Sequence, residues 1–104
     1  MKTFKYLETE CYLKLSNYRN NQNMAVMLMV AEGTLEGALY GVATVNLHPV
    51  DDDYAFIDYN NMPLIPGLFE KLGIAKPTGI KAQSGYCNYP LYQFNMNVLR
   101  EYTK

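Results

Sequence analysis

Alternation of apolar and polar residues dominates the first half of the chain and predicts β-strands. In "LETECYLKL" (7–15), apolar or small residues alternate with polar ones, as in a strand that buries one face. "MAVMLMVA" (24–31) is apolar at every position, so neither face of this strand suits water. "ALYGVATVNL" (38–47) alternates again after "GTLEG", which is typical of a hairpin turn. The first half therefore predicts a three-stranded antiparallel meander.

The second half predicts one short helix between further strands. "YAFID" (54–58) is expected to form a fourth strand. Pro66 suits a first helical position and Gly73 a helix end, and the apolar stripe between them predicts a helix over 66–73 that lies on the sheet. A short strand is expected near 80–83. The last residues, "MNVLREYTK", are expected to add a terminal helix or to fray.

The tyrosine-rich segment "SGYCNYPLYQFN" (84–95) predicts the closing strand. Pro90 has no N–H for a ladder, so we expect this strand to lie at a sheet edge or to begin there. Together the segments predict a single α+β domain over residues 1–104. Its antiparallel sheet would have about five to six strands, meander first, with one short helix at 66–73, and a barrel-like curl is one form open to it.

One short helix cannot cover both faces of so apolar a sheet. Either the sheet curls into a barrel-like or sandwich core, or loops and the terminal segment cover the second face, or that face contacts another protein. Tyrosine and methionine are enriched where proteins meet. We therefore hypothesise a contact surface for a protein partner or a second copy, formed by Tyr12, Met27, Met29, Tyr40, Tyr86, Tyr89 and Tyr92.

The charges are divided unevenly along the chain. Residues 20–70 hold seven acidic residues and no lysine or arginine, whereas the segments on either side are basic. Either neighbouring strands pair these charges, or one acidic side of the fold attracts a charged partner. With nine basic and ten acidic residues, the chain is poorly suited to the phosphate contacts that nucleic-acid binding needs. Single-stranded nucleic-acid binding through stacked tyrosines is therefore the alternative to a protein partner.

The residues of catalytic and metal chemistry are scarce. Two cysteines and one histidine fall short of the four ligands of a structural zinc site. A Cys87–His48 nucleophilic pair has no surrounding motif, and no glycine-rich phosphate loop is present. The acidic loop Asp51–Asp53, with Asp58, lacks the spacing of a calcium loop and is interpreted as solvated. We expect a non-enzymatic protein without catalytic residues, cofactor or metal.

The N-terminal segment argues against export. In "MKTFKYLETECYL", Glu8 and Glu10 interrupt the apolar run that a signal peptide needs. The longest apolar run, "MAVMLMVA", is far shorter than a membrane span. A cytoplasmic location without membrane contact is expected, with Cys11 and Cys87 as reduced thiols.

Several segments together resemble a known family. "GIAKPTGIKAQSGY" followed by "PLYQF", with "FKYLETECYLKL" near the start and "ATVNL" in the third strand, is similar to the uncharacterised domain of unknown function 4313. The resemblance spans about residues 3–94. It implies a small cytoplasmic accessory protein of a bacterial mobile element, of the conjugative or phage-like kind found in gut bacteria. The family has no established activity, so the resemblance assigns no site residue.

Overall fold

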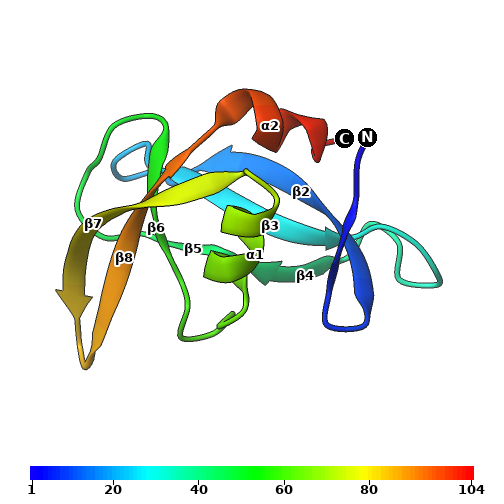
Figure 1. Ribbon diagram of the computed structural model, residues 1–104, viewed down its shortest axis with the longest axis horizontal. Helices are drawn as coiled ribbons and strands as arrows, with labels where there is room; N and C mark the ends of the chain where they lie inside the picture. Colours follow the sequence, from blue (N-terminus) through cyan, green and yellow to red (C-terminus); the bar gives the residue numbers. More distant parts are fainter.

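The computed structural model describes residues 1–104 as two antiparallel sheets and two short helices (Figure 1). Sheet A has the strand order β1 (Phe4–Tyr6), β2 (Thr9–Asn17), β3 (Met24–Val30) and β4 (Leu39–Val42). Sheet B has the order β5 (Thr44–Val45), β6 (Tyr54–Ile57), β8 (Cys87–Phe94) and β7 (Ala75–Ser84). The helices are α1 (Ile65–Lys71) and α2 (Met96–Glu101). The predicted α+β class and opening meander are confirmed, but the strands form two sheets that are not closed into a barrel.

The third predicted strand is the place where the two sheets separate. Ala43 donates its N–H to Val26 O of β3 at 2.8 Å, whereas its carbonyl accepts from Asp58 N, just after β6, at 2.8 Å. Thr44 is buried, and its Oγ1 accepts from Val26 N at 3.2 Å. One alternating segment therefore serves sheet A as β4 and sheet B as β5, because its hydrogen-bonding partner changes at Ala43.

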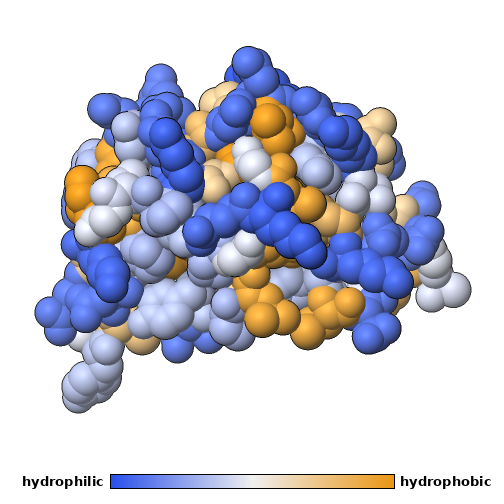
Figure 2. Space-filling model, in the orientation of Figure 1, coloured by the Kyte–Doolittle hydropathy of each residue, from blue (hydrophilic) through white to orange (hydrophobic).

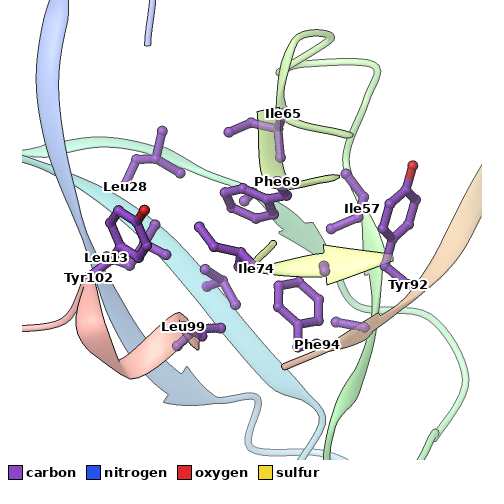
Figure 3. Packing of buried hydrophobic residues seen from close by; sticks show 14 of the residues in the cluster. Leu13, Leu28, Ile57, Ile65, Phe69, Ile74, Tyr92, Phe94, Leu99 and Tyr102 are labelled. Carbon is purple, nitrogen blue, oxygen red and sulfur yellow. The ribbon is translucent and has the colours of Figure 1, made fainter. Parts of the chain in front are cut away.

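The core lies between the two sheets and is filled from one side by α1 (Figure 3). Leu13 and Leu28 of sheet A face this core, as do Ile57 and Phe94 of sheet B. Phe69 of α1 is fully buried between them. The apolar stripe predicted for this helix is thus confirmed, and it positions an aromatic side chain at the centre of the molecule.

The closing strand neither lies at a sheet edge nor begins at Pro90, contrary to prediction. β8 is an inner strand, paired with β7 along most of its length and with β6 only over Leu91–Gln93. Pro90 pairs with Lys81 on the β7 side and lies just beyond the end of the β6 ladder. Its missing N–H therefore breaks no bond to β6. Beyond it the β7–β8 hairpin extends away from the body of the protein (Figure 1).

The C-terminal residues form a helix and do not fray, which confirms one of the two alternatives expected for this segment. Asn95 caps α2, because its Oδ1 accepts from Val98 N at 3.2 Å. After the helix, Tyr102 O accepts from Leu13 N at 2.8 Å, so this segment lies along β2 next to β1. Figure 1 shows the two termini side by side. Neither helix has the length and apolarity needed to cross a membrane.

Tyr92 links β8 to α1 and gives the fold a pH dependence. Its hydroxyl donates to Glu70 Oε2 at 2.7 Å. Burial, and then the hydrogen bond to Glu70, raise the pKa of Tyr92 to about 12, above the ordinary value of 10.0. Since the folded pKa is the higher one, this contribution to stability is complete below pH 10 and is lost as pH rises towards about 12.

Replacing Tyr92 with phenylalanine tests this dependence. At neutral pH the variant is expected to lose about 1 kcal/mol of unfolding free energy with the hydrogen bond. Between pH 10 and 12 the difference between wild type and variant should shrink, because the wild type then loses the same contribution. Urea denaturation of both proteins at a series of pH values measures the difference. A difference that stays constant through this range would contradict the assignment.

Candidate protein-binding groove

The residues predicted for contact do not form one surface. Tyr12 lies on the outer face of sheet A, but it is only 7% exposed, and Lys104 Nζ lies 5.5 Å from its ring centroid. Met27 and Met29 are half-buried beside it. Tyr92 is buried in the core cluster. The outer face of sheet A is therefore not a broad exposed apolar surface, because the C-terminal segment covers part of it.

Tyr40 was expected to share the outer face with Tyr12, and this was wrong. The β3–β4 ladder shifts register between Leu28 and Met29, so that Tyr40 is the extra residue of a β-bulge. A bulge interrupts alternation and re-aims the side chain. The ring of Tyr40 packs edge-on against Tyr6, with ring centroids 5.7 Å apart. Because Tyr6 belongs to the core cluster, Tyr40 lies towards the inner side of sheet A.

The remaining two predicted tyrosines lie on the projecting β7–β8 hairpin. Tyr86 is fully exposed in the turn. Tyr89 packs against Tyr59 with ring centroids 5.8 Å apart, and a hydrogen bond to Cys87 is the main cause that raises its pKa. The hairpin therefore carries a small aromatic cluster that is separate from Tyr12 and Tyr40.

The structure also places the residues considered for chemistry. His48 packs edge-on against Phe56, with ring centroids 5.0 Å apart, and no hydrogen bond joins it to Cys87. Cys11 is buried in the core, where burial raises the pKa of its thiol to about 11. Asp53 of the acidic loop accepts from Gln93 Nε2 at 3.1 Å. No group of three or more such side chains is arranged to hold a metal ion.

A groove opens where the β1–β2 turn, β4 and the loop before α1 meet. Its volume is about 530 Å³. Met62 forms its floor against Gly41, where an added Cβ would lie 3.0 Å from the Met62 Sδ. Figure 2 shows hydrophobic residues gathered in this region, at the lower edge of the molecule. The groove is lined by Tyr6, Leu7, Tyr40, Gly41, Val42, Asp58, Asn61, Met62, Pro63 and Leu64.

Large exposed apolar side chains are concentrated around this groove. Leu7 is 63% exposed on one side and Leu64 is 53% exposed on the other. Leu35 and Leu39 are also exposed, in or next to the β3–β4 loop. Tyr40 lines both the groove and a second hollow next to it, and Leu35 lines that second hollow. Exposed apolar patches of this kind on small proteins mark contact sites.

Leu7 is held in a strained backbone conformation. Its φ is +56°, in the left-handed region that costs a non-glycine residue about 1–2 kcal/mol. The sequence pattern counted Leu7 as the first buried residue of a strand, but the strand begins at Thr9 and Leu7 lies in the turn after the unpredicted β1. Leu7 is the first of the two residues between the paired Tyr6 and Thr9, a hairpin position where a positive φ is usual but leucine is not.

Replacing Leu7 with glycine is expected to raise the free energy of unfolding by about 0.5–1 kcal/mol. Relief of the left-handed strain exceeds the extra unfolded-state entropy of glycine. Urea denaturation measures the change. Leu35→Gly is the matched control: Leu35 is exposed and lacks a positive φ, so glycine there should lower stability. Equal losses in both variants would contradict the strain at Leu7.

The groove and the adjoining hollow are acidic. Asp58 lines the groove, and Glu8, Glu10 and Glu32 line the hollow next to it. No lysine or arginine lines either one. Lys5 of β1 pairs with Glu10 of β2 in the strand register, but its side chain forms no ion pair. Asp58 and Glu32 come from the acidic 20–70 segment, whereas Glu8 and Glu10 come from the basic N-terminal segment, and the fold brings them together as an acidic rim beside an apolar groove.

Of the residues that line the groove, only Tyr40 was predicted for contact, and the sequence analysis missed four exposed leucines in or near it: Leu7, Leu35, Leu39 and Leu64. Each lies within or beside a turn segment, in "YLET", "GTLEGAL" and "MPLIPG". A leucine among turn-forming residues is the signal that would have found them, because turns seldom bury large apolar side chains.

One comparison with known proteins found a match. The family model described as Domain of unknown function (DUF4313) matches residues 12–104. No curated protein and no solved structure matches the chain.

Proposed function

Because the chain belongs to the DUF4313 family, which carries no assigned activity, we propose a function from the groove itself: this is a small non-enzymatic protein that binds a protein partner. The observation that carries the proposal is the apolar groove with strained, exposed Leu7 at its rim. The lining offers contact area from leucines, a methionine and tyrosines, and Asp58 is its one carboxylate. Such a lining suits recognition of apolar side chains.

The proposal includes a biological setting that rests on the family resemblance. We propose a cytoplasmic accessory protein of a bacterial mobile element, whose partner is encoded by the host or by the element. A component of host defence is one such partner. The charge of the groove supports a partner of opposite sign, since an acidic rim steers cationic surfaces towards it.

Single-stranded nucleic-acid binding is the second candidate, and the β7–β8 hairpin supports it. Tyr86 is fully exposed there, and Lys81 and Asn88 line a hollow together with Tyr59. Stacking on exposed tyrosines with a nearby cation suits single strands. Binding of a single-stranded oligonucleotide that weakens with salt and is lost in Tyr86→Ala would favour this candidate.

Two matched substitutions test the proposed function. Leu64→Glu puts a charge into the groove, and Ile80→Glu makes the same change on β7, where Ile80 is 57% exposed and lies outside the groove. Wild type and Ile80→Glu should capture similar amounts of the partner from a bacterial lysate. Leu64→Glu should capture roughly tenfold less, because the partner loses its apolar contact in the groove.

Thermal unfolding of both variants controls for folding. Leu64 is the N-cap residue of α1, where an acidic side chain is tolerated by the helix dipole, so Leu64→Glu should remain folded. Equal capture by the two variants would overturn the groove as the binding site. Light scattering on the purified protein would show whether a second copy is the partner.

A further inference from the structure

β4 is the least protected of the four sheet edges, because it has four residues with no charge and no proline. Proteins shield edges with charged residues, proline, bulges or a covering segment, because an open edge pairs with other chains. β7 carries Lys76, Pro77 and Lys81 and shifts register between the last two. β5 has only two residues.

The remaining two edges belong to sheet A. β1 contains Lys5, and Lys2, two residues before this strand, donates its N–H to Glu101 O at 2.8 Å. β4 reads Leu-Tyr-Gly-Val, with no charge and no proline, and both ends of it line or adjoin the groove. Its one irregularity, the bulge at Tyr40, turns that ring towards the groove and leaves Val42 in regular register. The open edge of sheet A therefore coincides with the candidate site.

Val42 presents backbone hydrogen-bonding groups on this open edge. In an antiparallel ladder, successive residues direct their N–H and C=O alternately towards and away from the partner strand. Ala43 directs its N–H to Val26 O of β3, so the N–H and C=O of Val42 point away from β3. The side chain of Val42 lies on the outer face with its partner Met27, and Val42 nevertheless lines the groove. The groove thus reaches the backbone edge of the strand.

We propose that the partner binds as an extended segment that adds a strand to sheet A beside β4, and that this segment alternates cationic with apolar residues. This inference rests on the proposed function and specifies it. Backbone bonds to Val42 give affinity in such strand addition, and alternate side chains give specificity. The apolar side chains enter the groove between Leu7 and Leu64, and the cations meet Asp58 and the acidic hollow.

The acidic charge of the groove and the hollow favours an extended cationic segment over a second copy of the chain as the occupant. Two copies joined through their β4 edges would bring two acidic rims together, and like charges across an interface are unfavourable. An extended cationic segment of another protein has the opposite sign. The unpaired edge and the acidic rim therefore favour a hetero-complex.

A set of synthetic decapeptides tests the inference on the intact protein. An alternating lysine–valine peptide with blocked ends is expected to bind at least tenfold more tightly than the glutamate–valine peptide, and binding should weaken with salt. Methylation of all backbone amides of the lysine–valine peptide keeps its charge and removes its donors, and should lower affinity at least tenfold. Calorimetry measures the affinities, and amide NMR shifts should change most at Leu39–Val42 and Leu7.

The outcomes separate this inference from the proposed function. Equal binding of the methylated peptide would overturn strand addition, and equal binding of the glutamate–valine peptide would overturn the cationic partner. A dimer in light scattering that Val42→Pro dissociates would assign the edge to a second copy and also overturn the inference. In each case, loss of partner capture in Leu64→Glu would still support the groove as a binding site. If Leu64→Glu captures as well as Ile80→Glu, the proposed function itself fails.

Discussion

Replacing Phe69 with alanine is expected to lower the free energy of unfolding by about 3–5 kcal/mol. Phe69 is fully buried and packs edge-on against two rings, with centroids 6.5 Å from that of Phe4 and 5.9 Å from that of Phe94. These contacts join β1 of sheet A, α1 and β8 of sheet B. The substitution leaves a cavity that the two sheets cannot close without moving, and it removes both aromatic pairs.

A loss of this size is a large part of the roughly 5–15 kcal/mol that stabilises a typical domain. Urea denaturation followed by circular dichroism should therefore show a much lower midpoint. Lys71→Ala, on the exposed side of the same helix, is the control and should change stability by less than about 0.5 kcal/mol. Similar small effects of both substitutions would mean that α1 does not hold the sheets together.

Replacing Asn23 with alanine is expected to cost about 2–4 kcal/mol, because one buried side chain makes three hydrogen bonds. Its Nδ2 donates to Asn46 Oδ1 at 3.1 Å and to His48 O at 2.9 Å, and its Oδ1 accepts from Val50 N at 3.0 Å. Asn23 is 6% exposed. The substitution leaves the Val50 N–H without its partner and releases the 46–50 loop from the β2–β3 turn.

Hydrogen exchange locates this effect, since the amide of Val50 should lose protection in Asn23→Ala. The matched control is Asn97→Ala: Asn97 is exposed on α2, and alanine is the better helix former there. Asn97→Ala should leave stability unchanged or slightly higher. Unchanged stability in Asn23→Ala would show that water replaces the three bonds at no cost.

The candidate site was far less predictable than the fold. Alternation identified Met27 and Met29 as outward-facing, but it could not show that Tyr12 on the same face is nearly covered. It assigned Leu7 to a buried face because the three-residue strand before it, Phe4–Tyr6, is too short to recognise. Contact surfaces depend on which loops meet in space, and local patterns contain no such information.

The sequence by itself determined the strands at 9–17, 24–30 and 54–57, the helix beginning near Pro66 and the acidic middle of the chain. Periodicity, proline and glycine act locally, so these features can be deduced from neighbouring residues. Only the tertiary structure decided that the segment 38–47 divides between two sheets at Ala43 and that a bulge turns Tyr40 inward. It also placed Asp58 in a groove beside the open edge of β4, with three glutamates in the adjoining hollow. These outcomes depend on long-range hydrogen bonds to β3 and β6, which form only when the sheets pack together.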